Sequence, residues 1–405
     1  MQQKKSKQKF IILVTVLIDV IGMSIIIPVM PYFVEKLGAS AFTITTIFAI
    51  FALCSFLSAP LLGALSDKYG RRPALIVSLA STAIGWFVFG SAKTILFLFL
   101  GRIIDGMAAG NFPIAQSYIA DISETPAERT QNMGLIGTAF GVGFIIGPAI
   151  GAALSVVSLS FPFYFVGVLA TLNTIGAYFF LPETNTNKQI HKQISLNPFT
   201  PVVNAMKDKT LRIRYIVLFL FGLAFAAQQS VFALYMQNVF GFGVTGAGIV
   251  MAGLGLCMII NQVYLLRHVW LKKFSEASLE VWLLLAFAIG FFTMSIPVLI
   301  LFCLGLVIMI FAQSIFRAVI ASRITGFAGP HKKGEVSGMM NAFTTLGMVV
   351  GPLAIGTVYS INPQLPFIIS GIVLVIAFII MYFDEGIIPE SKYHHVEAEP
   401  VETIA

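Results

Sequence analysis

Twelve long apolar runs, joined by short polar segments, make up most of this chain. A helix needs about 20 apolar residues to cross a bilayer, and it satisfies its own backbone hydrogen bonds inside the hydrocarbon. The runs therefore predict an all-α membrane protein with twelve transmembrane helices. The predicted spans are residues 10–34, 43–65, 73–92, 95–117, 131–155, 162–181, 212–236, 244–266, 279–297, 299–322, 334–360 and 364–383.

The composition supports a chain that is solvated mainly by lipid. Charged residues make up 11% of its 405 residues, whereas a soluble domain contains about 25%. The net charge of +7 could suggest nucleic acid, but the basic residues lie between the spans, where membrane orientation and anionic headgroups explain them better. We expect a lipid bilayer as partner and no nucleic acid. The three cysteines stand singly in apolar runs, so neither a disulfide nor a metal site is expected.

Basic residues also predict the orientation of the chain. If the lysines before the first span are cytoplasmic, 21 of the 25 lysines and arginines fall on that side. Lys36 and Lys93 fall outside, and Arg102 and Arg317 lie within spans. Because cytoplasmic loops are enriched in Lys and Arg, we expect a multi-pass protein of the cell membrane with both termini cytoplasmic.

The chain divides into two halves that resemble each other. A polar, basic segment, 182–211, separates a six-helix half (1–181) from a second one (212–383), and a polar tail (384–405) follows. A shift of 204 residues brings Gly143 onto Gly347 and Gly147-Pro148 onto Gly351-Pro352. Parallel repeats of this kind place a substrate site between the halves, near the midplane of the membrane.

A short charged loop connects the second and third spans. Three cations and one anion lie between Gly63 and Pro73, which fits a cytoplasmic loop. A loop this short forces the two helices into an antiparallel hairpin. Gly63 would allow close approach of backbones, Gly70 would permit a tight turn, and Pro73 suits the first turn of the next helix.

This loop resembles the signature G-x-L-x-D-x-x-G-R-R/K of the major facilitator superfamily. The matching residues are Gly63, Leu65, Asp67, Gly70, Arg71 and Arg72. The resemblance implies a twelve-helix transporter with two six-helix pseudo-repeats. It also implies that Asp67 and Arg71 form a cytoplasmic charge network with Asp121 or Arg129, which gates the closed state.

Three ionisable residues are expected deep inside the membrane. Asp19 follows Lys9 by ten residues, which puts it about 15 Å deep at 1.5 Å per residue. A carboxyl group there readily takes up a proton, because hydrocarbon disfavours its charge. Arg102 and Asp105 are three residues apart on one helical face and can pair. Arg102 resembles the fourth-helix arginine that the superfamily associates with proton transfer, so we expect proton coupling at these three residues.

Small residues recur along the fifth span and predict tight helix packing. Pro148 would free a backbone carbonyl and permit bending. The pattern resembles the antiporter signature of the superfamily, and we interpret it as a bending face between the halves. Its members are Gly137, Gly141, Gly143, Gly147, Pro148 and Gly151.

The resemblance is strongest to the tetracycline and multidrug:proton antiporters. It rests on Leu17 to Gly22 with Pro28 to Pro31, on Glu128-Arg129, on Pro162-Phe163 and on Ala252 to Leu256. The chain departs from the tetracycline exporters because its third and ninth spans lack their acids, and its loop from Arg267 to Lys273 lacks the charged signature. Any proton coupling must therefore rest on the first half.

Polar and aromatic residues of the inner spans are candidates for a substrate cavity, since such surfaces bind amphipathic ligands. Ordinary helix packing is the alternative for the seventh span, and Arg317 could either snorkel or face the cavity. The candidates are Asn111, Gln116, Phe225, Gln228, Gln229, Phe232, Tyr235 and Arg317.

Together these features predict a monomeric secondary transporter that exports an amphipathic, drug-like small molecule in exchange for protons by alternating access. No phosphate-binding loop is present, so we expect a proton gradient and no cofactor to drive it. A proton-coupled metabolite symporter and a non-transporting membrane sensor stay open as alternatives. An enzyme is not expected, because no catalytic triad, metal set or catalytic carboxylate pair is visible.

Overall fold

The computed structural model describes residues 2–107, 109–123, 126–185, 199–327 and 333–387. Within these ranges the chain is helical and contains no strand. The helices are α1 (Gln2–Glu35), α2 (Ala41–Tyr69), α3 (Arg71–Gly90), α4 (Ile95–Met107), α5 (Asn111–Ile122), α6 (Pro126–Ser155), α7 (Phe161–Phe180), α8 (Phe199–Ala205), α9 (Arg212–Phe240), α10 (Val244–Ile259), η1 (Ile260–Trp270), α11 (Leu271–Lys273), α12 (Glu276–Met294), α13 (Leu299–Phe327), α14 (Lys333–Ile361) and α15 (Leu365–Ile387).

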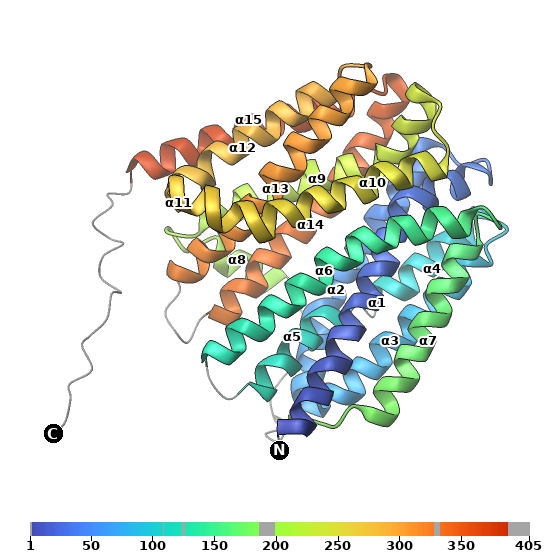
Figure 1. The fold of residues 1–405 in the computed structure, drawn as a ribbon, viewed down its shortest axis with the longest axis vertical. Helices are drawn as coiled ribbons and strands as arrows, with labels where there is room; N and C mark the ends of the chain where they lie inside the picture. Colours follow the sequence, from blue (N-terminus) through green and yellow to red (C-terminus); the bar gives the residue numbers. More distant parts are fainter. Residues whose placement is uncertain (1, 108, 124–125, 186–198, 328–332, 388–405) are drawn as a thin grey trace.

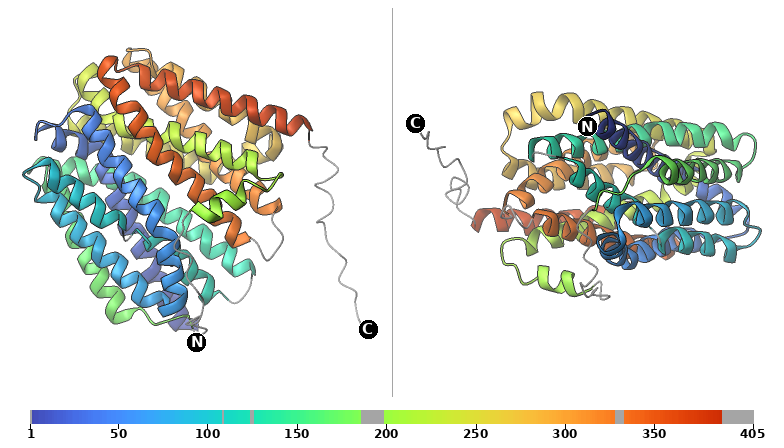
Figure 2. Two further views of the ribbon diagram at one scale, coloured as in Figure 1. Left: turned by 180° about the vertical axis from the view of Figure 1, so that it is seen from behind. Right: turned by 90° about the horizontal axis from the view of Figure 1, so that it is seen from below.

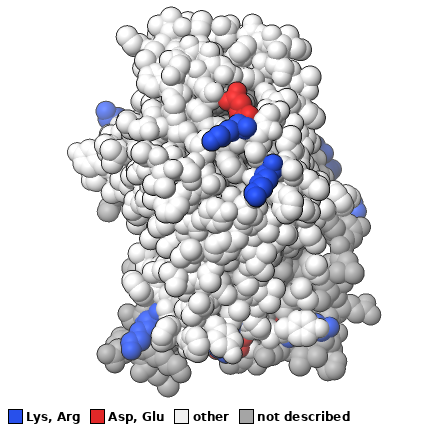
Figure 3. Space-filling model, turned by 90° about the vertical axis from the view of Figure 1, so that its right-hand side faces the viewer, with Lys and Arg blue, Asp and Glu red and all other residues white. Residues whose placement is uncertain are grey.

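Twelve helical segments among these residues are long and apolar enough to cross a membrane, which confirms the predicted fold class. Figure 1 shows them as long, roughly parallel rods. The face drawn in Figure 3 carries few charged side chains on a broad uncharged surface, in keeping with the composition. Residues 186–198 of the predicted linker and 388–405 of the predicted tail lie outside the described residues.

Two spans are less regular than the sequence suggested. The fourth span is broken between α4 and α5. Pro113 has no N–H, and its ring would clash with the carbonyl of Ala109 in a continuous helix. In the eighth span α10 continues as the π-helix η1. There Asn261 is buried, and its side-chain amide donates to Ser314 Oγ at 2.7 Å and to the carbonyl oxygen of Phe311 at 2.9 Å.

The two halves form adjacent bundles with the same internal pairing (Figures 1 and 2). In the first half α6 packs on α1, and in the second half α14 packs on α9. A Cβ atom at Gly147 would meet Ser24 and the carbonyl of Ile21 on α1, and one at Gly351 would meet the backbone of Leu223 on α9. The glycines that the 204-residue shift aligns thus make equivalent contacts.

The halves touch through α2 with α14 and through α6 with α10. We call the end of the molecule where α1 begins and α15 ends the terminal end, and the opposite one the far end. At the far end Tyr32 Oη donates to the carbonyl of Phe242 at 2.8 Å, and Gly356 lies against Phe42. Towards the terminal end, a Cβ at Gly137 or at Gly338 would meet no atom within 4 Å. These contacts join the halves at the far end, whereas Gly137 and Gly338 face open space towards the terminal end.

Candidate functional site

A cavity of about 450 Å³ lies between the first half and α14. Asp19 on α1, Thr82 on α3, Asp105 on α4 and Asn111 on α5 are among the polar residues of its wall. Aromatic rings make up much of the remaining wall, and α14 adds a short stretch of small and polar residues. The rings are Phe51, Phe56, Trp86, Phe112 and Phe140.

The polar residues of this wall form a connected network with Arg102. Arg102 Nη1 lies 3.3 Å from Asp105 Oδ2, and both side chains are buried. The guanidinium carbon of Arg102 is 4.3 Å from the ring centroid of Trp86, a cation–π contact that stabilises a desolvated cation. Asn111 Nδ2 donates to Thr82 Oγ1 at 3.2 Å. The charges of Arg102 and Asp105 thus compensate each other in a buried position.

The structure brings only part of the predicted site together. Asp19, Asp105 and Asn111 line the cavity, and Arg102 lies behind it. The other substrate-cavity candidates do not belong to the wall of this cavity; they are Gln116, Phe225, Gln228, Gln229, Phe232, Tyr235 and Arg317. Arg317 is exposed on α13, and Gln228 is buried on α9.

The assignment of Phe232 and Tyr235 to the substrate cavity was wrong for this cavity. Both rings are buried in the second half, where Tyr235 stacks on Phe302 at a centroid distance of 5.0 Å and meets Phe367 edge to face at 4.7 Å. They belong to an aromatic core that joins α9 to α13 and α15. The packing alternative for the seventh span therefore holds at these two positions.

Sequence reasoning missed the contributions of α2 and α3. Phe51, Ser55 and Phe56 line the cavity from α2, and Thr82 and Trp86 line it from α3. These spans look uniformly apolar, and a lone Thr in such a run is common. The available signal was Trp86 itself, because a large ring with a polar N–H is unusual in mid-membrane.

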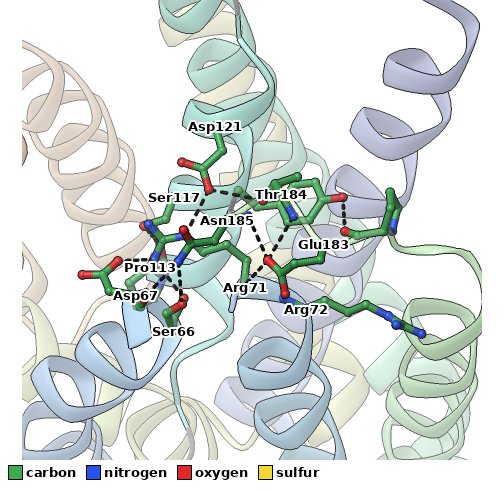
Figure 4. Close-up of polar contacts among 12 residues, drawn as sticks. Ser66, Asp67, Arg71, Arg72, Pro113, Ser117, Asp121, Glu183, Thr184 and Asn185 are labelled. Carbon is green, nitrogen blue, oxygen red and sulfur yellow. Dashed lines mark hydrogen bonds and ion pairs between the residues drawn. The ribbon is translucent and has the colours of Figure 1, made fainter. Parts of the chain in front are cut away.

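The charged loop after α2 forms a polar cluster at the terminal end (Figure 4). Arg71 lies 2.6 Å from Asp67 and 3.1 Å from Asp121, and it donates to Ser66 Oγ at 2.9 Å. The expected pairing partner Asp121 is therefore in contact. The side chain of Arg129 lies outside the described residues.

Glu183, just after α7, completes this cluster and was not singled out from the sequence. Its carboxylate accepts the backbone N–H groups of Arg71 at 2.9 Å and of Arg72 at 3.2 Å, at the start of α3 (Figure 4). An anion is stabilised there by the unpaired N–H groups and the helix dipole. Gly70 has a φ of 118°, and a Cβ there would collide with this carboxylate. Gly63, by contrast, makes no close approach, since a Cβ there would meet nothing within 4 Å.

The glycine pattern of α6 serves two surfaces. Gly143, Gly147 and Gly151 pack on α1 within the first half, so the interpretation of the whole pattern as a face between the halves was wrong. Contact with the second half comes from the other side of α6, where the carbonyl of Pro148 faces Gly248 of α10. Tight packing on α1 follows from the small residues at every fourth position.

Two parallel six-helix bundles around a polar and aromatic cavity define a membrane transporter fold. Residues 12–276 and 216–402 match the sequence profile of the Major Facilitator Superfamily, and together these matches cover most of the chain. The chain belongs to this superfamily.

Three known proteins illustrate the similarity. Multidrug resistance protein 2 of Bacillus subtilis (strain 168) is 27% identical over 390 residues, which cover 93% of this chain and 95% of that protein. The class C tetracycline resistance protein of Escherichia coli is 26% identical over 363 residues, which cover 88% and 91%. The crystal structure of the human organic anion transporter MFSD10 superimposes with a TM-score of 0.69 at 22% identity, covering 93% of this chain and 99% of that one.

Proposed function

We propose that this protein exports amphipathic, drug-like small molecules in exchange for protons. The observation that carries the proposal is the placement of two carboxyl groups, Asp19 and Asp105, in the wall of an aromatic cavity between two helical bundles. The names of its relatives, a multidrug resistance protein and a tetracycline resistance protein, support a drug-like substrate class.

The chemistry of the cavity favours an amphipathic cation or zwitterion. Aromatic faces bind the apolar body of a ligand and attract its positive charge. A carboxylate in an apolar surrounding is stabilised by either a proton or a cationic substrate. Competition between the two at Asp19 and Asp105 would couple substrate release to proton uptake.

A far end closed by contacts between the halves and a cavity nearer the terminal end fit alternating access. We place the terminal end in the cytoplasm because the basic residues gather there. In this orientation the cavity lies towards the cytoplasm, and the contacts of Tyr32 and Gly356 close the far end. The cluster around Arg71 lies at this open end, where it would take part in gating. Transport by a monomer, driven by the proton gradient without a cofactor, completes the proposal.

Cells expressing the wild type or Asp19→Asn, challenged with a panel of cationic dyes and antibiotics, test this function. We expect the wild type to lower the accumulation of at least one compound, and Asp19→Asn to abolish the effect, because an amide cannot carry the proton. Asp208→Asn is a matched control, since Asp208 caps the turn before α9 outside the spans and Asn caps equally well. Increased accumulation by the wild type would instead indicate uptake, and equal protection by Asp19→Asn would remove Asp19 from the mechanism.

A further inference from the structure

The geometry points to a winding switch in the eighth span. A clamp between Asn261 and Trp270 holds the segment η1 in its π form, and without this clamp η1 rewinds to an α-helix. The role of such a switch in transport rests on the proposed alternating access, but the winding itself can be measured without a substrate. Asn261 and Trp270 are positioning residues, since neither lines the cavity described above.

The clamp is a hydrogen bond that depends on the π winding. Trp270 Nε1 donates to Asn261 Oδ1 at 2.9 Å, across nine positions of the sequence. In an α-helix of 3.6 residues per turn, nine positions make about two and a half turns and lead to the opposite face. A π-helix closes i→i+5 bonds and has about 4.4 residues per turn, so nine positions make about two turns and return to the same face. The clamp therefore closes only in the π form.

The backbone shows where this winding ends. The N–H of Leu271 donates to the carbonyl of Leu266, five residues earlier. Directly afterwards the N–H of Phe274 donates to the carbonyl of Trp270, four residues earlier, at 3.0 Å. Most π-helices are single turns, whereas η1 has 11 residues. A π segment of this length needs a specific stabilising contact.

Asn261 provides this contact and also fastens η1 to α13. Its side chain is 0% exposed, and its amide nitrogen donates to Ser314 Oγ and to the carbonyl of Phe311. With the bond from Trp270, both N–H groups and the oxygen of the amide have partners. A buried amide left without these partners is unfavourable, so one side chain fixes both the winding of η1 and its packing.

The eighth span changes its partner where η1 begins. On the α-helical side, Gly248 and Gly255 of α10 pack on α6 of the first half. On the π side, Asn261 joins η1 to α13 of the second half. A movement between the halves would strain the span between these two attachments. A change of winding takes up such a movement and leaves the backbone hydrogen-bonded within the helix, as the membrane requires.

Rewinding has a consequence for the side chains that face the lipid. In the π form His268 is exposed, whereas Leu266 packs against the core of the second half. With Asn261 kept in its buried position, α-helical winding would turn residue 268 inward and residue 266 outward. The two positions therefore exchange their environments when the clamp opens.

Nitroxide labels at these two positions test the switch in the purified full-length protein, reconstituted in liposomes without substrate. Leu266→Cys and His268→Cys are made in a background in which the three native cysteines are replaced by alanine, and collision with oxygen dissolved in the lipid is measured. We expect position 268 to be the more accessible one, and the ratio of the two accessibilities to fall below one in Asn261→Leu. Trp270→Phe removes only the donor of the clamp and should lower the ratio in the same direction.

Asn173→Leu provides the matched control, because Asn173 is also buried and accepts a hydrogen bond from Thr15 at 3.0 Å. It should leave the ratio unchanged. The switch is overturned if both clamp variants keep the ratio of the background protein, or if Asn173→Leu lowers it as far. If the clamp variants respond as expected while the wild type lowers the accumulation of no compound in cells, the proposed function fails and the switch stands.

Discussion

The two halves share their helix pairing but bury their charges at different depths. In the first half Asp19, Arg102 and Asp105 lie in mid-span, at the cavity or directly behind it. In the second half the buried charges lie at the terminal end, where Arg214 and Glu280 are both 0% exposed. The same framework therefore carries ionisable side chains at a cavity in one half and an ionic cluster in the other.

This ionic cluster ties together four helices of the second half. Arg214 Nε on α9 donates to Glu280 Oε1 on α12 at 3.1 Å, and Arg214 Nη1 lies 3.6 Å from Asp384 Oδ2 on α15. Arg323 on α13 pairs with the same Glu280 carboxylate. The ring of Phe327 lies 4.7 Å from the guanidinium of Arg214. Two cations and two anions thus form one group, of which Arg214, Glu280 and Arg323 are buried and Asp384 is partly exposed.

In the first half the charges of the terminal end lie in the partly exposed cluster around Arg71, and the helices beneath it pack through apolar side chains. There α1, α3 and α5 meet through Ile12, Leu75, Leu79 and Ile119, which are all buried. A neutralised ionic cluster holds its geometry only while every partner is present, whereas an apolar contact tolerates small movements. The two halves thus differ in what holds their inner helices together towards the terminal end: ion pairs in the second half and apolar contacts in the first.

Breaking the ionic cluster should have the largest effect on stability. Glu280→Gln leaves Arg214 and Arg323 without their shared carboxylate, and removing one partner of a buried ion pair costs about 3–5 kcal/mol. We expect a marked fall in the midpoint of thermal unfolding in detergent. Glu276 lies one turn away, is only partly buried and accepts from Ser322 at 3.3 Å, so Glu276→Gln should cost less than about 1 kcal/mol. Equal effects of the two substitutions would contradict a closed cluster.

Filling the glycine contacts should have a smaller effect that is similar in both halves. Gly147→Ala would press on Ser24 and Ile21, and Gly351→Ala on Leu223. Overpacking of this kind costs about 1–3 kcal/mol. Gly137→Ala is the control, because its Cβ would enter open space, and it should stabilise the helix slightly. If thermal unfolding shows a loss of stability for only one of Gly147→Ala and Gly351→Ala, the two glycine contacts are not equivalent.

The sequence predicted what depends on periodicity and spacing. Apolar runs gave the twelve spans, and the shift of 204 residues gave glycine positions, such as Gly143 and Gly347, that do pack on equivalent helices. Local charge patterns also marked Arg71 and Asp67, which lie four residues apart across the turn at Gly70 and pair.

Contacts between distant segments could not be predicted in this way. From the sequence, Arg214 and Arg323 are expected to be cytoplasmic charges because they lie at the ends of spans. In the structure both side chains are buried and pair with Glu280. An aromatic residue such as Phe232 in an apolar span can face either a cavity or a neighbouring helix, and the sequence does not distinguish the two. Glu183 lies more than 100 residues beyond Arg71 in the sequence, and nothing local marks it as the anion at the start of α3.

Removing the charge of Glu183 should have the smallest effect on stability of these substitutions. It tests whether the two halves differ in their charge clusters at the terminal end. Glu183→Gln removes the charge from the start of α3 but keeps an acceptor, so it should cost about 1 kcal/mol. Because this cluster is partly exposed, added salt should reduce the difference from wild type. The buried Glu280 effect should persist at the same ionic strength. Glu35→Gln, at the end of α1, is the control and should change little. If Glu183→Gln lowers stability as much as Glu280→Gln, or if its effect does not change with salt, both halves depend on charge clusters that are shielded from solvent.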